Sequence, residues 1–375
     1  MREHKIYLFY LLIFIIEYFF IYTLFKEIRE AETDIYYSIS CLHVSDEIFY
    51  LQDLGGINVY KIFDQKIAAN YIRNSPINEK SQRHFILITL STSDYLENMK
   101  ICIKSAFKHG LKANELIIMS LDSDVYTYFI SQNIQTMFLN YTKVLQASWF
   151  VVGRLKQAIQ YYFNCYDTDV LFFESDMIFC NNFKDEMIER MNEESVDIQI
   201  MEERHDPKRS VDLSPAYYGY NIGLMLVKSS NKTRILFRRW LHDCYFTKDN
   251  LWDQNMFNFI ITNNAHVFGR NQSAQILFYR FHLEDQIFKL TFHFLNPVKF
   301  INYCSLIQET ANHFNTSKID LLLRFANEMN LKRPNLLHFA CINNVNKFTY
   351  MKKIDLNEDS YKYHMDYLKK FKFSN

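Results

Sequence analysis

Two carboxylates, Glu174 and Asp176, stand one residue apart inside an otherwise apolar stretch. Residues 170–173 before them and 177–179 after them are all apolar, which is typical of a buried strand. Buried strands rarely carry two acids, because an unpaired buried charge is costly. Oxygen ligands at positions i and i+2 suit a hard divalent cation that keeps open positions for substrate phosphates. The pair therefore predicts a metal site at a strand end, with simply solvated acids as the alternative.

The chain around this pair alternates apolar runs with segments of helical spacing from Arg83 onward. The predicted order is strand 84–90, helix 95–109, strand 116–121, helix 125–132, helix 150–163, the strand within 169–180 that carries the two acids, helix 185–191, strand 196–201 and helix 229–244. Strands alternating with helices imply βαβ units and a mostly parallel sheet with helices on both faces. Because ligands bind beyond the carboxyl ends of such strands, the position of Glu174 and Asp176 favours the metal interpretation.

Three later stretches carry polar residues that could belong to the same site. Asn221 and Gly223 stand just before an apolar strand, where glycine beside a short polar side chain indicates close backbone approach to a ligand, or else a tight turn. Asp253 and Gln254 begin a helix, where they could act in a site or cap the helix. His338 is the one histidine of a late apolar run. It is either a core residue or the group that completes a metal site with two carboxylates.

Composition excludes some classes of function. The 375 residues are ample for one large domain or two smaller ones. The 42 basic and 42 acidic side chains give a net charge of zero, which offers no support for nucleic-acid binding. The sequence has no P-loop and no G-x-G-x-x-G phosphate cradle. Its seven cysteines lack zinc spacing, so we expect mostly buried thiols, with one or two disulfides if the domain is lumenal.

Residues 6–25 predict a membrane anchor. These 20 residues carry a single charge, Glu17, and as a helix they would span roughly 30 Å, the thickness of a bilayer's hydrocarbon core. No cleavage site follows, so we expect an uncleaved signal anchor. Asn-x-Ser/Thr sequons, compatible with a lumenal domain, start at Asn140, Asn231, Asn271 and Asn315.

Taken in order, these pieces resemble the nucleotide-diphospho-sugar transferase family, Golgi-type glycosyltransferases with a GT-A fold. The series runs from a lysine-bearing helix through a D-x-D-like pair to Asn-x-Gly, Asp-Gln, and a late histidine followed by a lysine. The resemblance implies an α/β, GT-A-like (Rossmann-like) fold preceded by an N-terminal transmembrane helix. Its implied organisation is a cytoplasmic tail at 1–5, the anchor at 6–25, a stem at 26–82, a catalytic domain at 83–350 and a C-terminal helix or tail at 351–375.

The resemblance implies a metal-assisted enzyme. It would transfer a sugar from a nucleotide-diphospho-sugar, such as a UDP-sugar, to an acceptor hydroxyl on a glycan or protein. Charge that develops on the leaving diphosphate would be stabilised by a divalent cation and a lysine, and the acceptor hydroxyl would be held in line. The implied location is the Golgi or ER membrane in type II orientation, with the catalytic domain in the lumen.

The metal site implied by the resemblance is formed by Glu174, Asp176 and His338, which would hold Mn²⁺ (or Mg²⁺) and through it the diphosphate. Glu174 replaces the usual aspartate and reaches further, so direct metal contact is surest for Asp176. Lys347 would face the phosphates. A glycine expected between His338 and this lysine is replaced by Asn344.

Five further residues match substrate-binding and catalytic positions of the family. Lys156 falls at the basic position that would contact the donor. Asn221 and Gly223 match the loop beside the donor sugar. Asp253 and Gln254 match the pair near the sugar and the acceptor, and are the predicted catalytic residues.

Two other classes of protein remain open. A binding or scaffolding protein that has lost catalysis is suggested by Glu174 and Asn344, where the chain departs from the family. A glycosidase needs two carboxyl groups about 5–10 Å apart around a sugar, and Glu174 with Asp253 could be placed in that role. Sensitivity to EDTA separates the two enzymes, since a glycosidase needs no metal.

Overall fold

The computed structural model describes residues 65–139, 149–193, 195–203, 219–246, 253–271, 275–283, 286–296, 299–302, 335–340, 347–349 and 351–352. The chain divides into two units, 1–48 and 49–375, and all of the described residues belong to the second. The predicted anchor at 6–25 lies outside the described residues. Within the described ranges, no helix combines the length and the apolar character needed to cross a membrane.

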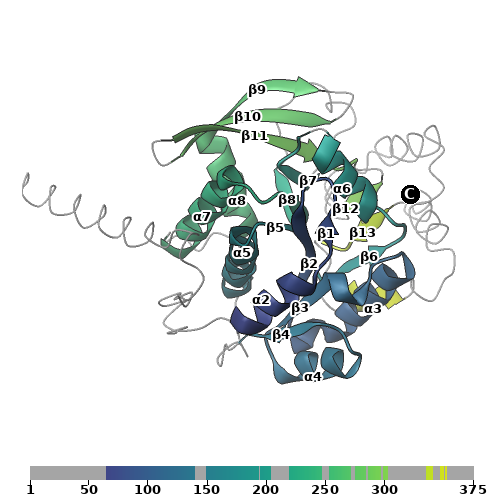
Figure 1. Ribbon diagram of the computed structural model, residues 1–375. Helices are drawn as coiled ribbons and strands as arrows, with labels where there is room; N and C mark the ends of the chain where they lie inside the picture. The colour runs from purple at the N-terminus through teal and green to yellow at the C-terminus, as the bar shows by residue number, and fades with distance from the viewer. Residues whose placement is uncertain are drawn as a thin grey trace, which may run out of the picture. The chain divides into compact units, whose positions relative to one another are not determined.

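A large sheet forms the centre of the described unit, with strand order β4-β3-β2-β5-β8-β7-β11-β10-β9 (Figure 1). Its strands are β2 (Arg83–Ser91), β3 (Leu116–Ser120), β4 (Thr136–Phe138), β5 (Thr168–Phe173), β7 (Ile198–Glu202), β8 (Tyr220–Val227), β9 (Ala265–Asn271), β10 (Ile276–Leu283) and β11 (Gln286–Phe294). Only β8 and β10 run opposite to the other strands of this path. The prediction of a mostly parallel sheet is therefore confirmed.

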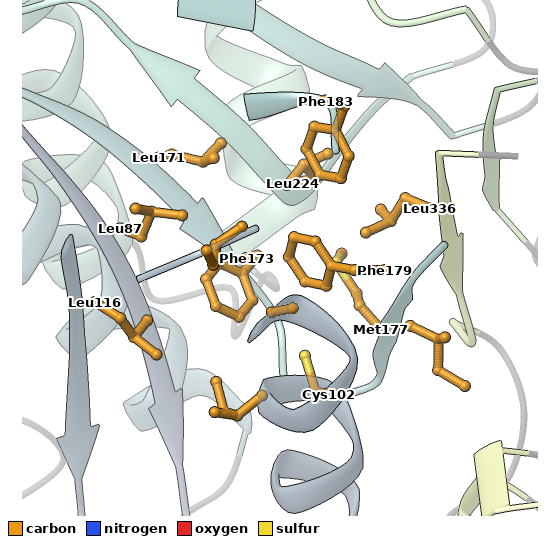
Figure 2. Close-up of a cluster of buried hydrophobic side chains, with 14 of the residues drawn as sticks. Leu87, Cys102, Leu116, Leu171, Phe173, Met177, Phe179, Phe183, Leu224 and Leu336 are labelled. Atoms are coloured by element: carbon orange, nitrogen blue, oxygen red, sulfur yellow. The ribbon is translucent and has the colours of Figure 1, made fainter. Parts of the chain in front are cut away.

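Helices cover both faces of this sheet, as predicted (Figure 1). They are α3 (Leu96–Lys108), α4 (Ser123–Ser131), α5 (Trp149–Cys165), α6 (Lys184–Glu193), α7 (Asn231–Phe246) and α8 (Asp253–Asn264). Neighbouring strand residues point to opposite faces. Phe172 of β5 faces α5, where its ring lies 4.6 Å from the ammonium of Lys156. Phe173 points the other way, into the core that includes Met99 and Cys102 of α3 (Figure 2).

A second, small sheet has the order β12-β13-β6, with β12 (Phe300–Asn302) parallel to β13 (Leu336–His338) and β13 antiparallel to β6 (Met177–Phe179). This sheet corrects the prediction of one continuous strand through the two acids. β5 ends in the large sheet, and β6 begins in the small one after a turn that holds Glu174 and Asp176. The apolar pattern is the same on both sides because both strands are buried. The rings of Phe173 in β5 and Phe179 in β6 pack edge to face, with their centroids 5.2 Å apart (Figure 2).

Two parts of the fold go beyond the predicted elements. Residues 65–82, in the predicted stem, form α2 (Gln65–Asn74) and β1 (Ile77–Asn78), and β1 pairs with β2. Ala68 and Ile72 of α2 are buried, and the Tyr71 hydroxyl donates to the Thr136 carbonyl at 3.2 Å. At the other edge, β9, β10 and β11 form an antiparallel ribbon. In β10 buried Tyr279, Phe281 and Leu283 alternate with exposed Arg280 and His282. This two-residue period is typical of a strand with one face buried and the other in solvent.

His293 of β11 makes unfolding dependent on pH. It is buried, with Nδ1 3.2 Å from Gln199 Oε1. Burial, aided by the charge of Arg190, lowers the pKa of the imidazole from about 6.5 to about 3. His293 therefore becomes protonated near pH 6.5 in the unfolded chain, but only near pH 3 in the folded chain. The stability due to neutral His293 is complete above pH 6.5 and falls with acidification, by up to about 1.4 kcal/mol per pH unit.

Urea unfolding between pH 7 and pH 4 measures this dependence. We expect the slope of the unfolding free energy against pH to become shallower in His293→Gln, by the equivalent of about one proton. His282→Gln, at an exposed site, is the control and should keep the wild-type slope. An unchanged slope in His293→Gln would show that other groups cause the acid sensitivity.

Candidate active site

The turn between β5 and β6 is held by backbone hydrogen bonds to both sheets. The Glu174 N–H donates to the Gly223 carbonyl of β8 at 2.9 Å. The Phe339 N–H, directly after β13, donates to the Asp176 carbonyl at 3.0 Å. Both acidic residues are therefore fixed by main-chain contacts before their side chains are considered.

Glu174, Asp176 and His338 form a compact cluster of possible metal ligands. His338 Nε2 lies 3.1 Å from Glu174 Oε2 and 3.4 Å from Asp176 Oδ1. One ligand atom from each residue lies within 4.8 Å of the others. Asp176 Oδ1 and His338 Nδ1 are buried and, within the described ranges, have no hydrogen-bond partner. Such orphaned buried atoms need an explanation, and two carboxylates with an imidazole are a donor set that fits a divalent cation.

The surrounding charges favour the ionised form of all three groups, and His338 would have to give up its proton to bind a metal ion. Burial opposes ionisation of both acids. For Glu174 the charges of Lys156 and His338 outweigh burial, and for Asp176 those of His338 and Lys347 do, so both pKa values lie below the usual range. Burial likewise opposes protonation of His338, but the two carboxylates outweigh it and raise the pKa of the imidazole to about 9.

Two lysines complete the charge balance. Lys347 Nζ lies 2.7 Å from Asp176 Oδ2, and Lys156 Nζ lies 2.8 Å from Glu174 Oε1. Both lysine side chains are buried. Each carboxylate therefore lies between one lysine and the shared imidazole of His338.

Asn221 and Gly223 lie inside β8, not before a strand as predicted. The pairing of β8 with β7 shifts register between Ile200 and Met201, as at a β-bulge. The predicted close approach at Gly223 is present. A Cβ there would lie 2.5 Å from His338 Cε1 and 3.0 Å from Glu174 Oε2. Asn221 Oδ1 accepts from the Gly223 N–H at 3.0 Å.

The pair at the start of α8 reaches the same place. Gln254 Oε1 accepts from the Ile222 N–H at 3.3 Å. Asp253 Oδ2 lies 3.5 Å from Lys156 Nζ. The structure thus brings all nine predicted site residues into one connected set of contacts, while Asn344 lies outside the described residues.

Two polar residues of this set were missed by sequence reasoning. Glu203, directly after β7, accepts from Asn221 Nδ2 at 2.6 Å and from Asn302 Nδ2 at 3.3 Å. A signal for Glu203 existed, because it follows a predicted strand just as Glu174 follows β5. Asn302 had no such signal, since the 99 residues that separate it from Glu203 hide the contact.

A family comparison decides the class of protein. Residues 111–351 match the nucleotide-diphospho-sugar transferase family. The chain belongs to the nucleotide-diphospho-sugar transferase family. This transferase is therefore a glycosyltransferase that uses a nucleotide-diphospho-sugar, as the resemblance implied, and the glycosidase alternative is not favoured.

Solved structures similar to this transferase are distant. The apo form of mouse xyloside xylosyltransferase 1 is 15% identical with a TM-score of 0.42, covering 68% of this chain and 98% of that one. The glycosyltransferase GlyE of Streptococcus pneumoniae TIGR4 is 12% identical with a TM-score of 0.43, and the match covers 76% of this chain and 64% of that one. The galactosyltransferase LgtC in complex with donor and acceptor sugar analogues is 12% identical with a TM-score of 0.42, and the match covers 71% of this chain and 95% of that one. No curated protein matches the sequence.

Gly223→Ala tests how tightly the cluster is packed. The added Cβ would collide with the His338 ring, so we expect weaker Mn²⁺ binding, by on the order of tenfold or more, measured by electron paramagnetic resonance. Gly219→Ala is the matched control. It is strained by a φ of +77°, but the atoms nearest to its Cβ would be those of Asn258 and Glu203, at 3.4–3.5 Å, which is ordinary van der Waals contact. We expect it to lower thermal stability and leave Mn²⁺ affinity unchanged, and equal Mn²⁺ affinities for the two variants would contradict the packing argument.

Proposed function

We propose that this transferase moves a sugar from a nucleotide-diphospho-sugar, such as a UDP-sugar, to a hydroxyl of a glycan or protein acceptor, and that a divalent cation, Mn²⁺ or Mg²⁺, assists it. Glu174, Asp176 and His338 would hold the cation. The observation that carries this proposal is the gathering of their three ligand atoms within 4.8 Å. Buried Asp176 Oδ1, which lies 3.4 Å from His338 Nε2 but has no hydrogen-bond partner within the described ranges, supports it further.

The chemistry follows from the charges around the diphosphate. A bound divalent cation would neutralise the charge that develops on the leaving group. Lys347, ion-paired in the acidic turn, adds a positive charge on the same side. Asn221 and Gly223 would bind the donor sugar, and Asp253 with Gln254 would hold the sugar and the acceptor hydroxyl in line. Their contribution is positioning, which can supply a large part of the rate acceleration.

We also propose a type II membrane protein of the Golgi or ER, anchored by residues 6–25, with a lumenal catalytic domain. The apolar length of 6–25 supports the anchor. In microsomes from expressing cells, we expect added protease to leave the catalytic domain intact until detergent is present. Digestion without detergent would contradict the lumenal location.

Asp176→Asn tests the role of the acidic turn in catalysis. The change keeps the shape of the side chain but removes the ligand charge. We expect a loss of Mn²⁺-dependent UDP release from UDP-sugars of on the order of 100-fold or more. Asp185→Asn, at a side chain that is 74% exposed on α6, is the matched control and should retain activity.

Wild-type activity in Asp176→Asn would contradict the proposal that the turn of Glu174 and Asp176 holds a cation needed for catalysis. A wild-type protein that binds UDP with Mn²⁺ but releases no UDP from any UDP-sugar, with or without acceptor, would favour the binding or scaffolding alternative.

A further inference from the structure

Asp253 packs directly onto the backbone of α5. A Cβ added at Gly153 would lie 2.8 Å from Asp253 Cβ, 2.9 Å from its Cγ and 3.0 Å from its Oδ2. The first two atoms are close to the main chain of α8, so they cannot swing aside as the end of a long side chain can. Glycine is therefore the residue that lets α8 begin so close to α5.

Lys156 lies one turn further along α5 and contacts the same aspartate. Its Nζ is 2.8 Å from Glu174 Oε1 and 3.5 Å from Asp253 Oδ2, and the Phe172 ring centroid lies 4.6 Å away. The residue is only 4% exposed. Burial opposes its charge, but the carboxylates of Glu174 and Asp253 outweigh burial and raise the pKa of the ammonium. This enclosed cation joins two acids from different elements.

The remaining polar atoms of Asp253 are also held. Its Oδ1 accepts from the Gln254 N–H at 2.9 Å, and its carbonyl accepts from Trp240 Nε1 of α7 at 2.9 Å. One carboxylate oxygen is thus directed to α8 and the other to Lys156. The side chain is thus held between α5 and α8, and the backbone carbonyl of Asp253 is held by α7.

We infer that Gly153 and Lys156 form a socket on α5 that positions Asp253 and ties it, through the lysine ammonium, to Glu174. Lys156 is then a positioning residue between the acidic turn and the start of α8, instead of the donor-contacting residue that the resemblance implied. The inference rests on the proposed function for its catalytic consequence, since Asp253 is a predicted catalytic residue. The positioning of Asp253 by Gly153 and Lys156 rests only on the observed distances and does not depend on the proposed function.

Gly153→Ala separates this role from simple helix stability. It leaves every charge in place, and alanine favours a helix over glycine, so a glycine with no special role would tolerate the change. The socket instead requires Asp253 to move. With UDP-glucose, UDP-galactose and UDP-xylose as donors, we expect kcat for UDP release to fall on the order of 10- to 100-fold. Mn²⁺ affinity should fall less than kcat does, because the new Cβ contacts Asp253 and none of the proposed metal ligands.

Gly269→Ala is the matched control, because Gly269 lies in the ribbon of β9 to β11 and the atom nearest to its Cβ would be one of Phe278, at 3.4 Å. We expect it to keep wild-type kcat. An unchanged kcat in Gly153→Ala would overturn the socket.

An activity-free measurement tests the contact itself. In the wild-type background, we expect Gly153→Ala to lower the unfolding temperature, because the new Cβ collides with Asp253. In an Asp253→Gly background the collision is removed, so the same change should raise the unfolding temperature through helix propensity. The same sign in both backgrounds would overturn the socket. An inactive wild type would instead overturn the proposed function, and this reversal of sign could still be measured.

Discussion

Charge compensation around two nearby acids, Asp176 buried and Glu174 partly exposed, is the constraint on which the site depends. Glu174 and Asp176 each have a lysine on one side and share His338 between them. Without these cations the carboxylates would repel each other, and their removal from water would be costly. Lys156 from α5, His338 from β13 and Lys347 from a short helical segment must therefore meet at one turn. Three distant parts of the chain are brought together by this single electrostatic requirement.

The fold meets this requirement by joining two sheets at the acidic turn. β5 belongs to the large sheet and β6 to the small one, so the chain turns where the acids stand. Two of the chain's seven glycines lie at the closest approaches around it. Gly223 makes room for the His338 ring, and Gly153 makes room for Asp253. The site is thus specified as much by missing side chains as by charged ones.

Much of this arrangement could be predicted from local pattern. The strand at 84–90, the helix at 95–109 and the late histidine were visible as apolar runs, helical spacing and motif order. The break between β5 and β6 was not, because two buried strands in sequence give the same apolar pattern as one. The partners of Lys156 were also hidden, since ion pairs between α5, the turn after β5 and α8 depend on tertiary packing. The ribbon of β9 to β11 carried a visible alternation in β10 that was overlooked.

The central claim is that the acidic turn binds a nucleoside diphosphate through a divalent cation. Calorimetric titration of UDP into the protein, with Mn²⁺ and then with EDTA, tests it most directly. We expect UDP to bind at least about tenfold more tightly with Mn²⁺, a difference of about 1.4 kcal/mol. By linkage, UDP should tighten Mn²⁺ binding by the same factor. Equal UDP affinity in Mn²⁺ and in EDTA would contradict the account.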